Sequence, residues 1–174
     1  MLRFQSMISQ LHEMKDNLIE FPIDRKLYNL ALAYASEQSQ LENGLKVFYN
    51  TMAVWAVNHL LGWFEIETIL GNHDDWTVGI EATLDLADLM LPGIGKIQCC
   101  RIYEGDKKIF VQAQADRIVY IFVEFPDPLE TLKPLGFFPA PATHSDTLDI
   151  SVDELQLFDR LEDYLKQFEE KSCD

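Results

Sequence analysis

Cysteine, long apolar runs and positive charge are all scarce in this chain of 174 residues. Its three cysteines, Cys99, Cys100 and Cys173, are too few and too unevenly spaced to form the disulfide framework of a small secreted domain. No stretch approaches the roughly 20 consecutive apolar residues that cross a bilayer. The N-terminus also lacks the compact apolar region and cleavage site of a secretory signal. We therefore expect a cytoplasmic protein with reduced thiols and no membrane contact.

Acidic residues outnumber basic ones by 29 to 14, which gives a formal net charge of -15 at pH 7. The excess is largest in residues 124–174, which contain 13 Asp and Glu against 4 Lys and Arg. Because phosphates are bound mainly by Lys and Arg, this balance argues against direct contact with nucleic acid. It favours a basic protein partner, although an acidic surface also keeps a protein soluble without any specific partner.

The length and the 48% hydrophobic content are sufficient for one core, so we expect a single domain over residues 1–174. Apolar residues spaced by three and four predict an extra helix in residues 1–20, which could also join two copies of the chain in a homo-oligomer. Asp24 is a candidate N-cap for a second helix. A third helix, apolar nearly all round, is predicted from about Leu45 to Leu61, with His59 as a hydrogen-bonded core residue.

Short β-favouring stretches follow these helices. The alternating residues 63–68 predict a strand. The apolar run from Ile118 to Val123 predicts a central strand covered on both faces, which begins at Asp116 and Arg117 with the arginine paired locally. Another strand is predicted over residues 134–140, where prolines end the pairing. The order of elements predicts an α+β domain, with N-terminal helices and a C-terminal helix packed on a mainly antiparallel sheet.

The pair Gly105-Asp106 predicts a two-residue hairpin that places Cys100 opposite Val111. Neighbouring strand residues point to opposite faces, so the adjacent cysteines are unsuited to forming one disulfide or holding one metal ion. We expect Cys100 to be in the core. Cys99 is expected on a mixed, more accessible face, which makes it the more reactive thiol.

Few residues suggest catalysis. His73, Asp74 and Asp75 form the best candidate ligand site, with a plain polar loop as the alternative. Asp85 and Asp88 are a candidate carboxylate pair for acid–base chemistry, with capping or turn formation as the alternative. The chain has no phosphate-binding loop and no nucleophile elbow. We assign no catalytic, cofactor-binding or metal-binding residue and expect that the protein is not an enzyme.

Residues 151–170 predict an amphipathic C-terminal helix, which starts with a capping box formed by Ser151 and Glu154. Apolar residues on one face of this helix are candidate anchors in the groove of a partner protein. These partner-binding candidates are Leu155, Phe158, Leu161 and Leu165. The alternative is that the same face closes the protein's own core.

Four strings, together with Phe21-Pro22-Ile23 before them, occur in an order that resembles a family of small cyanobacterial proteins known only as a domain of unknown function. The strings are KVFYNTMAVWAVNHLLGWFEIET, DLADLMLPGIGKIQC, DRIVYIFVEF and LGFFPA. The resemblance covers about residues 21–140 and implies no activity or site residue. It does imply a regulatory role, with a sigma factor or a caspase-like protease as the kind of partner.

The sequence as a whole favours a non-catalytic regulatory or adaptor protein that binds another protein, such as a basic regulator. One alternative is an enzyme or ligand-binding protein whose site is assembled from distant residues such as His73, Asp74, Asp85 and Cys99. Another alternative is an acidic inhibitor that mimics DNA, which would fit the charge alone.

Overall fold

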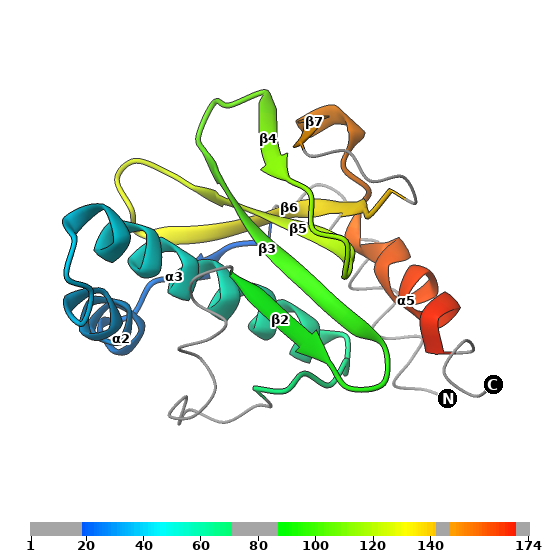
Figure 1. Ribbon diagram of the computed structural model, residues 1–174, viewed down its shortest axis with the longest axis horizontal. Helices are drawn as coiled ribbons and strands as arrows, with labels where there is room; N and C mark the ends of the chain where they lie inside the picture. The colour runs from blue at the N-terminus through cyan, green and yellow to red at the C-terminus, as the bar shows by residue number, and fades with distance from the viewer. Residues whose placement is uncertain (1–18, 71–86, 142–146, 170–174) are drawn as a thin grey trace.

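The computed structural model describes residues 19–70, 87–141 and 147–169 (Figure 1). The helices and strands are β1 (Phe21–Pro22), α2 (Arg25–Ser36), α3 (Leu41–Trp63), β2 (Asp88–Leu91), β3 (Gly95–Tyr103), β4 (Lys108–Gln112), β5 (Arg117–Phe125), β6 (Thr131–Pro139), β7 (Thr147–Ser151) and α5 (Leu161–Glu169). Two 3₁₀ helices, η1 (Val152–Glu154) and η2 (Phe158–Arg160), precede α5. The helix predicted in residues 1–20 lies largely outside the described residues.

A five-stranded sheet in the order β1-β6-β5-β3-β2 forms the centre of the fold, and β4 and β7 form a separate two-stranded sheet. Only the β3–β5 pair is parallel among these strands. The prediction of an α+β fold with a mainly antiparallel sheet is therefore confirmed. Strand β5 is the central strand, and its apolar residues are buried on both faces, as the uninterrupted apolar run predicts.

The two faces of the sheet carry separate cores. On one face, Val119 and Ile121 of β5 pack with α3, whose Val57 and Leu60 are fully buried. On the other face, Tyr120 and Phe122 of β5 pack with residues of β4 and β7. In Figure 1, β4 and β7 accordingly lie on the opposite side of the sheet from α3. The period-two alternation of β5 thus divides its side chains between two hydrophobic clusters.

The predicted hairpin is wrong in its pairing. Strand β4 pairs with β7, with Val111 opposite Leu148, while Cys100 of β3 lies opposite Phe122 of β5. The chain does turn at Gly105, which has a φ of 86°, but β4 leaves the sheet so that the more apolar β5 can pair with β3. Cys100 and Val111 still share one hydrophobic cluster, because both strands turn their apolar faces toward it.

Helix α2 begins as predicted, whereas α3 is longer than predicted. The Asp24 carboxylate caps α2 by accepting a hydrogen bond from the backbone N–H of Leu27 at 2.7 Å, as predicted. Helix α3 begins four residues earlier than predicted and includes Gly44, where an added Cβ would lie 3.0 Å from the Ala35 carbonyl oxygen of α2. Gly44 therefore lies within α3, where it permits the close approach of the two helices. It does not belong to a turn that precedes α3.

The strand predicted at residues 63–68 is also wrong. Helix α3 continues to Trp63, and Phe64 closes its last turn. Glu65 then adopts a φ of 59°, in the left-handed region, which is incompatible with an extended strand. The alternating pattern here reflects half-buried residues in an irregular segment.

The C-terminal helix begins ten residues later than predicted. Ser151 and Glu154 do form a capping box, but it caps the short η1 helix. Gln156 then forms a β-bridge with Phe137 of β6, with N–O distances of 2.9 and 2.8 Å. This bridge requires extended backbone, so a continuous helix cannot form until α5 begins at Leu161.

Candidate protein-binding surface

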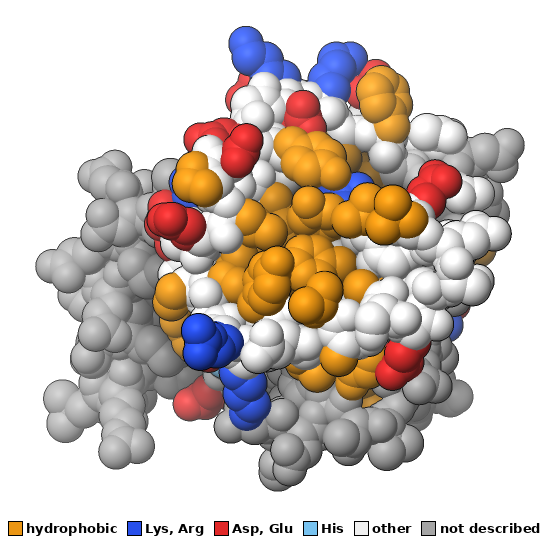
Figure 2. Space-filling view, turned by 90° about the vertical axis from the view of Figure 1, so that its left-hand side faces the viewer, with side chains coloured by type: hydrophobic (Ala, Val, Ile, Leu, Met, Phe, Trp, Pro, Cys, Tyr) orange, Lys and Arg blue, Asp and Glu red, His pale blue; other side chains and the backbone are white. Residues whose placement is uncertain are grey.

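Helices α2 and α3 form an open groove of about 620 Å³ at the end of the fold that lies on the left in Figure 1. Its apolar lining residues are Tyr28, Leu32, Ala35, Leu41, Leu45, Phe48, Tyr49 and Leu129. Figure 2 views this end of the molecule and shows hydrophobic side chains gathered into a continuous patch at its centre. We call this surface the α2–α3 groove.

The apolar side chains of the groove are unusually accessible for their type. Leu41 is 82% exposed, Leu45 52%, Leu32 51% and Tyr28 46%. Leu41 and Leu45 are four residues apart on α3, and Tyr28 and Leu32 are four apart on α2, so each pair forms a short apolar stripe on its helix. The buried stripe of α2, which includes Leu27, faces α3 and the core instead.

Aromatic rings hold the floor of the groove in place. The Phe48 ring meets Tyr28 and Tyr49 edge to face, each at a centroid distance of 5.4 Å. Tyr49 in turn packs on Phe125 at 5.5 Å, and the Arg101 guanidinium lies over the Tyr49 ring at 4.6 Å. Because Phe125 is buried in the main core, the groove is a supported, preformed surface.

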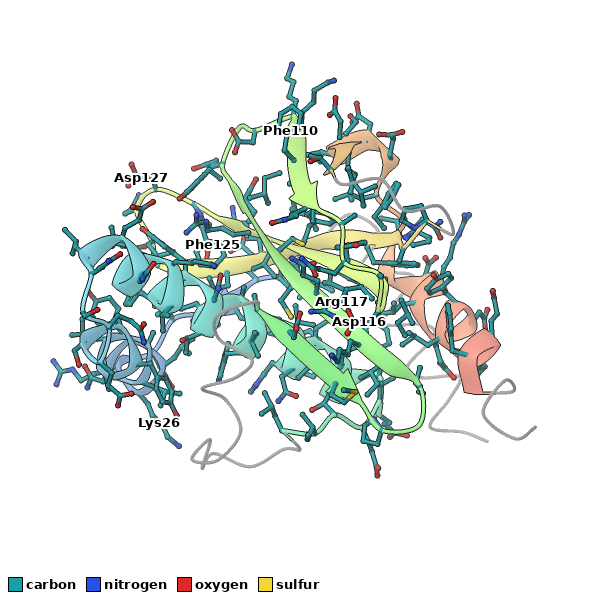
Figure 3. The ribbon with its side chains drawn as sticks, in the orientation of Figure 1. Lys26, Phe110, Asp116, Arg117, Phe125 and Asp127 are labelled. Atoms are coloured by element: carbon teal, nitrogen blue, oxygen red, sulfur yellow. The ribbon has the colours of Figure 1, made fainter. Side chains whose placement is uncertain are left out.

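Exposed carboxylates predominate around the α2–α3 groove. Glu37 follows the end of α2 and Glu42 follows Leu41 on α3, while Asp127 and Glu130 flank Leu129 in the loop between β5 and β6. Figure 3 shows Asp127 at the outer end of this loop, and Figure 2 shows acidic side chains at several points around the patch. The exposed bases nearest the lining residues in sequence are Lys26 and Lys46, with Arg25 one residue further from Tyr28. The groove therefore combines an apolar floor with a mainly acidic border.

The four predicted partner anchors do not contribute to this surface. Leu161 is 0% exposed, and Phe158 and Leu165 are also buried, all in the cluster shared with α3. Leu155 is half-buried against the other cluster. The structure thus places the apolar face of the C-terminal segment in the protein's own core, which is the alternative left open above.

The candidate catalytic residues do not form a site among the described residues. His73, Asp74, Asp75 and Asp85 lie outside them. Asp88 is buried at the start of β2, where it is paired with Arg117. Within residues 19–70, 87–141 and 147–169, no group of three His, Cys, Asp or Glu side chains is placed to hold a metal ion.

Two further predictions for single residues are wrong. Cys99 is 3% exposed and packs in the cluster on the α3 side of the sheet, because β3 is covered on both faces. His59 is exposed instead of being a core residue, and its ring stacks on Trp55 at a centroid distance of 4.4 Å. The expectation that the two cysteines point to opposite faces is confirmed.

Both thiols are expected to resist alkylation in the native protein. Burial raises the pKa of Cys99 and of Cys100 well above the usual range, so neither forms the reactive thiolate near pH 7. A Cys173→Ser variant should therefore react with iodoacetamide only in denaturing urea, as measured by mass spectrometry of the two β3 thiols. The same raised pKa values make the free energy of unfolding depend on pH. The contribution of the two thiols is complete below their unfolded-state pKa of about 8.5 and is lost as the pH rises above it. Rapid native labelling of Cys99 alone would show that the α3 side of β3 is open.

Sequence reasoning missed the α2–α3 groove. The signal was present in α2, where Tyr28 and Leu32 lie off the stripe of Leu27 and Ala31, so the helix is apolar on more than one face. A second apolar face on a helix outside the centre of a fold indicates a second contact surface. Leu41 lies before the helix predicted from about Leu45, so the prediction gave no sign of its place on α3.

Comparisons with known proteins identify a family but no activity. A family model described as "Protein of unknown function (DUF1822)" matches residues 21–172. Searches of curated proteins and of solved structures found no match. Among the described residues, no helix combines the length and the apolar character needed to cross a membrane.

Proposed function

The chain belongs to the DUF1822 family of proteins of unknown function, and we propose that it is a non-catalytic regulatory or adaptor protein that binds a partner protein. The partner contributes a basic amphipathic helix, which lies in the α2–α3 groove. The observation that carries this proposal is the exposure of Tyr28, Leu32, Leu41 and Leu45 on two adjacent helices.

An exposed apolar patch with a polar border is characteristic of a protein-interaction surface, because leaving such a patch in water is unfavourable. A hollow between two helices suits the apolar face of a third helix, whose anchors at positions i, i+3 or i+4 and i+7 enter it side by side. The aromatic floor formed by Phe48 and Tyr49 supplies the rigid contact area on which such anchors pack.

Charge complementarity favours a basic helix over an acidic one. Glu37, Glu42, Asp127 and Glu130 at the border attract Lys and Arg side chains that flank the apolar anchors. The net charge of -15 adds a long-range attraction that accelerates association with a basic partner at low salt. A sigma factor or a caspase-like protease with such a helix is the kind of regulator that the family resemblance suggested.

The test compares a groove variant with a matched control. Leu32→Glu with Leu45→Glu introduces two carboxylates at half-exposed positions in the groove. The control, Phe110→Glu, introduces one carboxylate on β4, where Phe110 is 71% exposed. A partner captured from the native cell by the wild-type chain should be recovered with the control but not with the groove variant. A peptide of its basic helix should bind the groove variant about tenfold more weakly or worse in fluorescence anisotropy.

Other occupants of the groove give different results. If the wild-type chain sediments as a dimer and the groove variant as a monomer, the occupant is a second copy and the proposal is wrong. If the peptide binds only after residues 1–18 are deleted, the chain's own N-terminal segment occupies the groove and the proposal is also wrong. Equal partner recovery with the groove variant and the control would show that binding uses another surface.

A further inference from the structure

A second cavity, of about 430 Å³, lies between β1, the first half of α2 and the last turns of α3. Its walls include the rings of Phe21, Trp55, His59 and Trp63, and we call it the aromatic cavity. Its volume is in the range of ordinary small-molecule sites. It shares no lining residue with the α2–α3 groove, so an inference about it goes beyond the proposed function and does not depend on it.

Helical spacing explains why three of these rings converge. Trp55, His59 and Trp63 are at positions i, i+4 and i+8 of α3 and therefore lie on one face of the helix. Strand β1 brings Phe21 against all three, with ring centroids 6.0 Å from Trp55, 5.6 Å from His59 and 4.8 Å from Trp63.

The rings meet mainly at steep angles. Phe21 is inclined by 88° to Trp55 and by 67° to Trp63, and only Trp55 and His59 are stacked, at 21°. Phe21 is buried and forms the base of this ring cluster, so the ring surface open to a ligand comes mainly from α3. Trp63 is 50% exposed, so ring surface remains open to a ligand. The negative faces of aromatic rings attract cations.

The charges at the cavity also favour a cation. Two carboxylates, Glu20 and Asp24, line it with one base, Lys26. A second base, Lys133, is outside the lining and is shared between Glu20 and Glu124. The Glu20 carboxylate is 43% exposed and lies 3.4 Å from the Lys133 ammonium, which is a long contact for an ion pair. One Asp24 oxygen caps α2. Figure 3 shows Lys26 on the lower side of α2.

We propose that the aromatic cavity binds an alkylated ammonium group. Such a group is large and weakly hydrated, and its methyl surface packs on aromatic faces while its charge is attracted by the rings and by the nearby carboxylates. A primary ammonium would require hydrogen-bond acceptors directed at its N–H groups, and the cavity offers mainly ring surface. The group could belong to a free choline-like molecule or to a methylated lysine of a protein.

The experiment titrates the full chain with tetramethylammonium, choline and a trimethyl-lysine peptide, followed by tryptophan fluorescence and calorimetry. The neutral compound 3,3-dimethylbutan-1-ol, which has the shape of choline without its charge, is the matched probe. We expect saturable binding of choline and about tenfold weaker binding of the neutral probe, since cation–π attraction is worth roughly 1–2 kcal/mol in a partly desolvated site.

Variants assign the binding to the cavity. Trp63→Leu keeps apolar surface but removes the ring, and should weaken choline binding about tenfold. Trp63→Phe should restore most of it, while Phe110→Leu on β4, at a residue that lines neither cavity, should leave it unchanged. Tighter binding of the peptide than of choline identifies a protein source, and the reverse order identifies a free molecule. Equal affinity for choline and the neutral probe, or no saturable binding of any cation, would overturn the proposal.

Discussion

Replacement of Arg117 by leucine is expected to lower the free energy of unfolding by about 3–5 kcal/mol, because it leaves the buried Asp88 carboxylate without its counterion. The Arg117 side chain is only 2% exposed, and Asp88 is 10% exposed. Arg117 binds Asp88 through Nε, at 2.8 Å from Oδ1, and through a second nitrogen, and it also pairs with Asp116. Urea unfolding followed by circular dichroism measures the loss.

The same pair is not expected to be a large net source of stability. Burial raises the pKa of Asp88, although the Arg117 guanidinium lowers it, which indicates that the cost of burying the carboxylate outweighs its compensation by the arginine. An Asp88→Val, Arg117→Leu double variant should therefore recover most of the stability lost in the single variant. As a control, Lys108→Leu removes an exposed pair with Asp149 and should cost less than about 1 kcal/mol. A double variant no more stable than Arg117→Leu alone would contradict this account.

Leu161→Ala is expected to lower the free energy of unfolding by about 2–5 kcal/mol, because it removes buried methyl groups and leaves a cavity. Leu161 is 0% exposed at the first position of α5, in the cluster shared with α3. Four residues earlier, Leu157 is 57% exposed, so Leu157→Ala should change stability by no more than about 0.5 kcal/mol. Thermal and urea unfolding of the two variants provide the comparison.

These two leucines also decide between two roles of the C-terminal segment. If Leu161→Ala costs no more than Leu157→Ala, α5 is not part of the folded core, and its apolar face becomes available to a partner as first predicted. If the difference is several kcal/mol, the segment is required for folding. Its deletion could not then be used to test partner binding, because the deleted chain would be destabilised.

The features predicted correctly from the sequence are those determined within a few residues of chain. Asp24 caps α2 because its side chain reaches a backbone N–H three residues away. The run from Ile118 to Val123 becomes the central strand because continuous apolar character requires cover on both faces. Asp116 and Arg117 mark its start, and the arginine pairs with its neighbour as predicted.

The features predicted wrongly depend on residues far apart in the chain. Cys100 and Val111 share a cluster whether or not β3 and β4 pair, so their side-chain pattern is the same for a hairpin and for the observed arrangement. The helix predicted from residue 151 is interrupted because Gln156 bonds to Phe137 of β6, and no local pattern encodes that bridge. The sequence of α2 shows two apolar faces, but which of them stays exposed in the α2–α3 groove depends on how the chain folds.

The borders of the five-stranded sheet limit how two chains could join. At one border, β1 is two residues long and contains Pro22, which has no backbone N–H to donate. At the other, the Met90 carbonyl of the four-residue β2 already accepts a hydrogen bond from the Ile69 N–H at 2.9 Å. Such short or already bonded border strands offer few free backbone N–H and C=O groups with which a strand of another chain could pair. This protects the sheet against edge-to-edge aggregation. Recognition through this sheet would have to use side chains rather than strand addition.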